Sequence, residues 1–275
     1  MSQRIDRCFS TARDNGRKVL IPFITAGDPA PGWTVQLMHQ LVAGGADLIE
    51  LGIPFSDPMA DGPVIQASSA RAVAKGVDLG QVLDWVRSFR RTDIQTPVVL
   101  MGYMNPFERY GYARLAKDTS EAGVDGLLLV DCPPEEMQSL QSSLDEYGVY
   151  SIRLVAPTTT EDRLQHIVHS AQGFIYYVSF KGTTGAGRLD VDALSGPIQR
   201  IRRNSSLPVA VGFGIKDAES AAAVARTADA VVIGSALVEQ LAACEQSGAA
   251  GECAERFIAS IRQSLDNGGN SAGKR

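Results

Sequence analysis

The sequence has 275 residues, of which 44% are hydrophobic and 21% are charged, with a net charge of −5 at pH 7. This composition is typical of a globular protein, and a chain of this length can bury a full core. The acidic excess provides no basic surface for nucleic acid or anionic membranes, and no apolar run is long enough to span a bilayer. We therefore expect a cytoplasmic protein that binds neither.

The N-terminal segment predicts an amphipathic helix ahead of the first strand. Apolar side chains recur there with helical spacing, at Ile5, Cys8, Phe9 and Ala12. The surrounding residues are polar and charged, whereas a signal peptide has an apolar centre.

Eight β-branched, nearly continuous apolar runs follow, as expected for parallel strands that are buried on both faces. The predicted strands are Val19–Thr25, Asp47–Leu51, Pro97–Gly102, Gly126–Asp131, Tyr150–Ala156, Gly173–Ser179, Val209–Gly212 and Ala230–Gly234. Amphipathic stretches between them predict helices at Gly32–Ala43, Asp78–Phe89, Ala113–Ala122, Glu135–Tyr147 and Glu161–Ser170. Such alternation indicates a closed barrel or a doubly wound open sheet, and the count and even spacing favour a (β/α)8 barrel.

The domain organisation follows from the same pattern. No composition shift or linker divides the chain, so we predict a single barrel domain over residues 1–265. From Asp266 onward the composition cannot bury a core, and we predict a disordered tail over residues 266–275. Pro22 lies inside the first strand and removes a ladder donor, but the apolar residues around it still favour a strand.

The four cysteines, at positions 8, 132, 244 and 253, have no paired metal-ligand spacing. We expect reduced thiols, as in a cytoplasmic protein, and no metal site. The three histidines are His39, His166 and His169. All of them fall in predicted helices away from the strand ends, so none is expected to be catalytic.

In parallel α/β barrels the functional groups project from the C-terminal ends of the strands and from the loops that follow. Glycines follow the last strands in this sequence, at Gly214 and Gly234, and the segment Lys181–Gly187 after strand six is also glycine-rich. Backbone N–H groups can approach phosphate oxygens at such turns, so we predict a phosphorylated ligand. Tight strand-to-helix turns are the structural alternative.

Three carboxylates lie at strand ends. Glu50 ends an otherwise apolar strand, where a carboxylate is costly unless it is used or paired. Asp61 lies in the next loop, where aspartate is also common as a turn residue or helix N-cap. Two acids in different environments could divide proton transfer and charge stabilisation. Asp131, after strand four, is a third candidate, with a turn-forming role as its alternative.

The segment Glu50–Gln66 closely resembles the signature segment of tryptophan synthase α subunits. Four shorter segments add to this resemblance, which covers the chain from about Arg4 to Arg262: Pro22–Pro29, Tyr103–Pro106, Gly212–Ile215 and Ile233–Ala236. The resemblance implies a carbon–carbon lyase that cleaves indole-3-glycerol phosphate into indole and glyceraldehyde 3-phosphate in tryptophan biosynthesis. It implies no metal or organic cofactor in this chain. The partner would be a pyridoxal-phosphate β subunit that consumes the indole, within an α2β2 heterotetramer.

Roles for individual residues come from this resemblance. It makes Glu50 the general acid–base group and Asp61 the acid that binds the indole N–H. The substrate-binding positions that it implies are Phe23, Tyr103, Tyr176, Thr184, Gly185, Phe213, Gly214, Gly234 and Ser235. Thr184 belongs to the strand-six loop, which is expected to close over the site and contact Asp61.

The strand-six loop departs from the family pattern, because Lys181 replaces a small or neutral residue. A Schiff-base aldolase that uses Lys181 is one alternative, although a glycine-rich loop is a poor place for a desolvated lysine. A non-catalytic activating subunit is another, and an isomerase for a phosphorylated substrate is a third. The pair Glu50 and Asp61 argues against a pure binder, and the segment Glu50–Gln66 argues against an isomerase.

Overall fold

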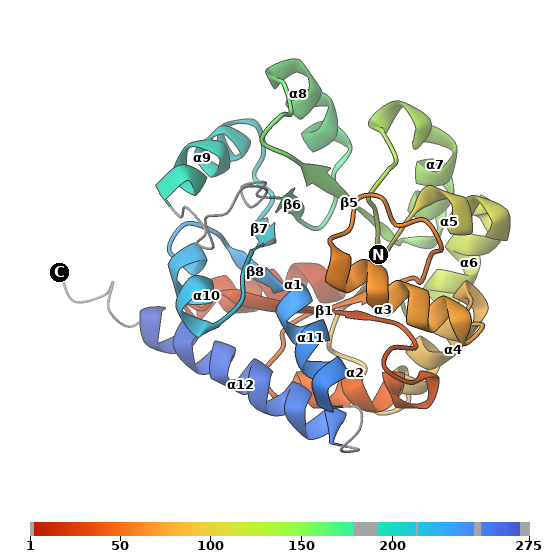
Figure 1. The fold of residues 1–275 in the computed structure, drawn as a ribbon. Helices are drawn as coiled ribbons and strands as arrows, with labels where there is room; N and C mark the ends of the chain where they lie inside the picture. Colours follow the sequence, from red (N-terminus) through yellow and green to blue (C-terminus); the bar gives the residue numbers. More distant parts are fainter. Residues whose placement is uncertain (1–2, 179–191, 213, 245–248, 270–275) are drawn as a thin grey trace.

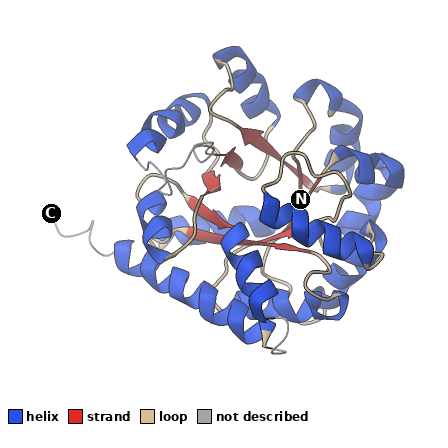
Figure 2. Cartoon of the chain, in the orientation of Figure 1, coloured by secondary structure: helices blue, strands red, loops and turns tan. Residues whose placement is uncertain are grey.

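Parallel strands form a closed barrel with helices around it (Figures 1 and 2). The computed structural model describes residues 3–178, 192–212, 214–244 and 249–269. The strands are β1 (Val19–Thr25), β2 (Ile49–Gly52), β3 (Val98–Gly102), β4 (Gly126–Leu129), β5 (Tyr150–Val155), β6 (Ile175–Val178), β7 (Val209–Gly212) and β8 (Ala230–Ile233). Each pairs with the next, and β8 closes the ring on β1. The predicted (β/α)8 barrel is confirmed.

The helices alternate with the strands along the chain. They are α1 (Gln3–Asp14), α2 (Thr34–Ala43), α3 (Pro63–Ala74), α4 (Leu79–Arg90), α5 (Met104–Tyr110), α6 (Tyr112–Ala122), α7 (Gln138–Tyr147), α8 (Glu161–Ser170), α9 (Ser195–Asn204), α10 (Ala218–Ala225), α11 (Ser235–Cys244) and α12 (Ala250–Gly269). Three short 3-10 turns are η1 (Pro31–Trp33), η2 (Pro134–Glu136) and η3 (Asp192–Leu194). Within the described part of the chain, no helix is long and apolar enough to cross a membrane.

Side chains along each strand alternate between two separate cores, because successive residues point to opposite faces. Leu20 and Ile24 of β1 belong to the core between strands and helices. Val19 and Ile21 of the same strand belong to the core inside the barrel. Helix α1 contributes Ile5, Phe9 and Ala12 to that inner core, so the predicted N-terminal helix closes one end of the barrel.

Hydrogen bonds at the N-terminal ends of the strands follow a regular pattern. The residue just before an even-numbered strand accepts a hydrogen bond from a backbone N–H at or near the start of the preceding odd-numbered strand. The pairs are Leu20 N to Asp47 Oδ2, Val98 N to Asp125 Oδ2, Val209 N to Asp229 Oδ2, and Ser151 N to the Oε1 of Gln172. An arginine neutralises each aspartate, as Arg90 does for the buried Asp125 at 2.9 Å. Such bonds satisfy backbone donors that begin the strands and tie the strands together in pairs.

Most predicted elements are found within a residue or two of their expected bounds, with two instructive differences. The helix predicted from Gly32 starts as a 3-10 turn, and the regular helix begins at Thr34. The tail predicted from Asp266 begins too early, because α12 continues to Gly269. Asp266 pairs with Arg17 at 3.2 Å, which holds this end of the helix against the barrel, and with Arg262 of the same helix at 2.7 Å. Pro22 lies within β1 opposite Ile233, as expected.

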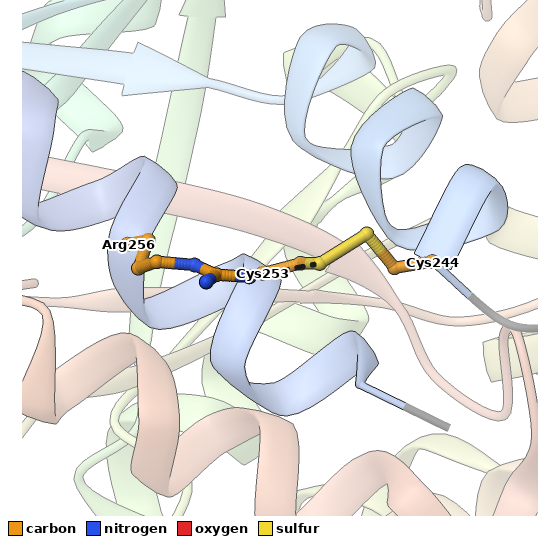
Figure 3. Close-up of a disulfide and its surroundings, with 3 residues drawn as sticks. All are labelled: Cys244, Cys253 and Arg256. Atoms are coloured by element: carbon orange, nitrogen blue, oxygen red, sulfur yellow. Dashed lines mark hydrogen bonds between the residues drawn. A yellow bond between two sulfur atoms is a disulfide. The ribbon is translucent and has the colours of Figure 1, made fainter. Parts of the chain in front are cut away.

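The expectation that every cysteine is reduced is wrong for one pair. Cys244, at the end of α11, and Cys253, in α12, form a disulfide (Figure 3). Arg256 donates a hydrogen bond to the Sγ atom of Cys253 at 3.8 Å. Sequence spacing could not reveal the bond, because it depends on how two helices pack. Cys8 and Cys132 are free thiols, and burial raises the pKa of Cys8 to about 12.

Reducing this disulfide is expected to lower the free energy of unfolding by about 2–3 kcal/mol, because the bond closes a short loop in the unfolded chain. For a protein of 275 residues that change corresponds to a fall in the melting midpoint of roughly 3–5 °C. Thermal melts with and without dithiothreitol measure it. The matched control is the double variant Cys244→Ser/Cys253→Ser. It should melt at the midpoint of the reduced wild-type chain, and dithiothreitol should not change that midpoint. Equal midpoints for the oxidised and reduced wild-type chain would contradict the expectation.

Candidate active site

Glu50 lies in the middle of β2 and is completely buried. Its backbone is in register with Phe23 of β1 and Val99 of β3. Val99 belongs to the core inside the barrel, and Leu48, two residues before Glu50, does too. The alternation of side chains along a strand therefore directs the Glu50 carboxyl into the barrel.

The Glu50 carboxyl has an unusual electrostatic environment. Neither of its oxygens has a hydrogen-bond partner in the described part of the structure. Burial raises the pKa of Glu50 from 4.5 to about 8, because desolvation disfavours the charged form. Among the described residues, no arginine or backbone group binds this carboxyl, as a purely structural glutamate would require. At neutral pH the side chain is a protonated acid whose proton can be transferred.

Asp61 lies in the loop between β2 and α3 and is half-buried. The hydroxyl of Tyr103 donates to Asp61 Oδ2 at 3.0 Å and accepts from Ala60 N at 3.0 Å. Burial raises the pKa of Asp61, and the hydrogen bond from Tyr103 opposes that change. Gly62, not Asp61, occupies the N-cap position of α3. Asp61 is therefore not a helix cap, and Tyr103 is a polar partner as well as a wall of the site.

The loop that carries Asp61 is fixed to α3 by side-chain hydrogen bonds. Ser69 Oγ accepts from Phe55 N and donates to Phe55 O, both at 2.8 Å. The Gln66 amide donates to Asp61 O at 2.8 Å. Three prolines lie in or beside this loop, and proline limits the conformations that a chain can adopt. The Asp61 carboxylate is thus held in place from both its backbone and its side chain.

A cavity lies at the ends of the first strands, and Asp61 forms part of its wall. Its lining residues come from β1 to β4, the loops after them, and α3: Phe23, Thr25, Gly52, Ile53, Asp61, Ile65, Ser69, Met101, Gly102, Tyr103 and Val130. The sequence predicted Phe23, Asp61 and Tyr103 here and missed the others. The alternation along β1 could have identified Thr25, because it lies two residues after Phe23.

Gly52 is required by the shape of this cavity. A Cβ atom at Gly52 would lie 2.5 Å from Cζ of Phe23. Since that contact is far shorter than real Cβ contacts, the glycine leaves room for the Phe23 ring against β2.

Tyr176 reaches the same region from β6. It is buried, and desolvation together with the nearby charges of Glu50 and Asp61 raises its pKa well above the usual value. A Cβ atom at Gly212 of β7 would lie 2.0 Å from the Tyr176 hydroxyl oxygen. The glycine therefore leaves room for the tyrosine, which stays protonated at neutral pH.

The predicted phosphate positions are partly described. Gly214 has a φ of +79°, a conformation that favours glycine. Gly234 directly precedes α11, and its carbonyl accepts from Val238 N at 3.0 Å, so Ser235 begins that helix. The N-terminus of a helix offers free N–H groups and a positive potential to an anion. Thr184, Gly185 and Phe213, together with Lys181, lie outside the described residues.

Other predicted groups have structural surroundings. Asp131 Oδ1 accepts from Met104 N at 2.8 Å and so holds the start of α5, which is a structural contact between two loops and not the local turn that its alternative role implied. His39 lies in α2, and His166 and His169 lie in α8, as predicted. No group of three or more potential metal ligands was found among the residues that the structure describes.

Comparisons with known proteins agree with these features. The family model described as tryptophan synthase alpha chain matches residues 9–267. The tryptophan synthase alpha chain of Xanthomonas axonopodis pv. citri is 56% identical over 267 residues, covering 97% of this chain and 100% of that protein. That of Ralstonia nicotianae is 57% identical, covering 96% and 99%.

Solved structures agree as well. The crystal structure of tryptophan synthase subunit alpha from Legionella pneumophila has a TM-score of 0.90 at 46% identity, covering 96% of this chain and 98% of that one. A chain of tryptophan synthase from M. tuberculosis, in its aminoacrylate-bound form, has a TM-score of 0.85 at 32% identity, covering 95% and 99%.

Proposed function

The chain belongs to the tryptophan synthase alpha chain family, and we propose that Glu50 and Asp61 are the two acids that perform the family's reaction at its barrel mouth. The protein is a carbon–carbon lyase of tryptophan biosynthesis that cleaves indole-3-glycerol phosphate into indole and glyceraldehyde 3-phosphate. The buried carboxyl of Glu50 inside the barrel, which has no hydrogen-bond partner among the described residues, is the observation that carries the assignment of the acids.

The proposed mechanism begins with the proton on Glu50. Transfer of that proton to indole C3 makes the ring an electron sink, and Asp61 stabilises the positive charge by accepting a hydrogen bond from the ring N–H. Removal of the proton from the glycerol hydroxyl next to the ring then breaks the carbon–carbon bond. The bonding electrons return to the ring, giving indole and an aldehyde. Glu50 suits both proton transfers, because its pKa of about 8 lies close to neutral pH.

The remaining predicted residues would bind the substrate within the single barrel domain. Phe23 and Tyr103 line the cavity and would contact the indole ring. Tyr176 would contact the reacting side chain. Gly214, Gly234 and Ser235 would hold the phosphate together with Gly185 and Phe213, and Thr184 would contact Asp61. Incubating the purified chain with indole-3-glycerol phosphate and following indole release tests the function directly.

The phosphate site is tested by filling the space that the ligand must use. A Cβ atom at Gly234 would meet Phe23 at 3.5 Å, an ordinary contact, so Gly234→Ala should fold normally. We expect glycerol phosphate to bind this variant at least tenfold more weakly, and Gly234→Val more weakly still, because the side chain keeps the phosphate from the backbone. Isothermal titration calorimetry measures the affinity, and thermal melts check the fold. Unchanged affinity in both variants would remove Gly234 from the phosphate site.

The partner proposal concerns the same end of the barrel. We propose that a pyridoxal-phosphate β subunit docks on the loop Pro54–Asp61, receives the indole, and forms an α2β2 heterotetramer with this chain. In that loop Met59 is 90% exposed, as expected for an apolar side chain that a partner covers. We propose no cofactor for this chain itself. Its proposed location is the cytoplasm, where the pathway operates.

A charged side chain at position 59 is expected to weaken the complex with the β subunit. Met59→Asp should raise the dissociation constant for the β subunit at least tenfold and leave the isolated chain's activity near that of the wild type. Ile94 is 65% exposed but lies between α4 and β3, at the opposite end of the barrel, so Ile94→Asp is the matched control. Calorimetric titration of each variant with the β subunit measures the difference. Equal losses for both variants would argue against docking at the mouth.

A further inference from the structure

Two buried hydroxyl groups, one in the cavity wall and one behind it, lie in contact with each other. Thr25, at the end of β1, lines the cavity, and Ser68 lies on α3. Their Oγ atoms are 2.7 Å apart, and the two residues are 3% and 0% exposed. Ser68 Oγ also donates a hydrogen bond to Ile65 O at 2.8 Å.

This arrangement fixes the direction of the hydrogen bond between the two side chains. A serine hydroxyl has one hydrogen, and that of Ser68 is directed to Ile65 O. Thr25 must therefore be the donor in its contact with Ser68. The Thr25 oxygen keeps its lone pairs, and no donor to that oxygen is found in the described part of the chain.

The other hydroxyl groups of the cavity wall also donate their hydrogens to acceptors within the protein. Tyr103 gives its hydrogen to Asp61 Oδ2, and Ser69 gives its hydrogen to Phe55 O. Tyr103 Oη and Ser69 Oγ each also accept from a backbone N–H. Among the described residues, no side-chain or backbone donor to Thr25 Oγ1 is found, and Tyr103 is the donor to the Asp61 carboxylate, so both groups can accept from a ligand. Such a wall complements a ring that carries an N–H group. A ring without that group leaves the acceptors unpaired, which costs binding energy.

We propose that Thr25, oriented by Ser68, is a specificity-determining residue that gives the ring N–H of the indole moiety a second acceptor beside Asp61. The inference rests on the proposed function, which places the indole ring in this cavity. It adds the source of the preference for a ring nitrogen with a hydrogen. Ser68 does not touch the substrate and acts by holding the Thr25 hydroxyl.

The test compares the binding of indole and benzofuran to the purified chain by calorimetry. The two rings have nearly the same shape, but benzofuran has an oxygen in place of the N–H. Thr25→Val, which keeps the size of the side chain, should lower the ratio of the two affinities by about threefold to tenfold, the range of one neutral hydrogen bond. Thr25→Ser should keep the ratio. Ser68 still donates to Ile65 O in both variants, so neither leaves a buried donor unpaired.

A double-mutant cycle tests the role of Ser68. In Ser68→Ala the Thr25 hydrogen is free to turn into the cavity, so the affinity ratio should fall. In the Thr25→Val background, Ser68→Ala should change the ratio no further, because the two residues act as a unit. Melting midpoints near that of the wild type verify that each variant is folded.

The outcomes separate this inference from the proposed function. If the wild-type chain releases indole from indole-3-glycerol phosphate but Thr25→Val keeps the full preference for indole, the role of Thr25 is wrong and the proposed function stands. Independent, additive effects of the two substitutions would overturn the role of Ser68. A wild-type chain that releases no indole would overturn the proposed function itself.

Discussion

Glu50→Gln is expected to lower kcat by on the order of 10²–10⁴ with little change in substrate affinity. Glutamine has nearly the same shape as the protonated glutamate but cannot transfer a proton. Because both Glu50 oxygens lack partners among the described residues, the substitution breaks no hydrogen bond that the structure shows. Steady-state kinetics of indole release measures the loss. A variant that keeps more than about a tenth of the wild-type kcat would contradict the assignment.

The pH dependence provides a second readout for Glu50. A general acid with a pKa of about 8 loses its proton above that pH, so the wild-type rate should fall as the pH rises through 8. Glu50 should also affect stability, because its pKa in the folded state lies above the ordinary value of 4.5. Its contribution is fully present below pH 4.5 and is lost as the pH rises toward 8. The loss amounts to roughly 5 kcal/mol at most. Glu50→Gln should therefore unfold at higher denaturant concentration than the wild type at pH 8, and this difference should shrink at pH 5.

Asp61→Asn is expected to lower kcat by about 10²–10³, because it removes the negative charge that we propose stabilises the protonated ring. An asparagine carbonyl can still accept the hydrogen bond from Tyr103, so the melting midpoint should stay within a few degrees of the wild type. Indole-release kinetics and thermal melts measure the two effects separately.

The neighbouring acid in the same loop is the matched control for Asp61. Asp57 is exposed and lies outside the cavity lining, so Asp57→Asn should leave the isolated chain's activity nearly unchanged. Equal losses in both variants would mean that the charge of the loop, and not the position of Asp61, supports the reaction. A large loss of stability in Asp61→Asn would instead indicate that Asp61 has a structural role.

The barrel could be predicted from the sequence because its strands are buried on both faces. A run such as Val19–Thr25 is almost wholly apolar, and eight such runs alternating with helices leave few other folds. Glu50 was identifiable for the same reason, since a lone carboxylate is conspicuous in an apolar strand. The end of α12 was predicted less well, because its last residues are polar and Asp266 is held there by an ion pair with Arg17, which is distant in the sequence.

The features that the sequence did not predict depend on contacts between distant segments. The hydrogen bond between Tyr103 and Asp61 joins two loops, and the family resemblance implied only that Tyr103 binds the substrate. The pair Thr25 and Ser68 joins a strand to a helix that is 43 positions away in the sequence. The bond between Cys244 and Cys253 forms only if α11 and α12 pack so that the two Cα atoms lie close together, here at 6.7 Å. Periodicity shows which face of an element is buried, but it does not show which polar atoms meet there.

Helix α1 closes the N-terminal end of the barrel. Ile5 and Phe9 fill the N-terminal end of the interior, so a small molecule that enters between the strand ends cannot pass through to the far side. Substrate and both products must therefore enter and leave at the C-terminal ends of the strands. A partner bound over the open end would therefore determine the path of indole. Because α1 closes the other end, indole could leave only into the partner or past the phosphate-bearing product.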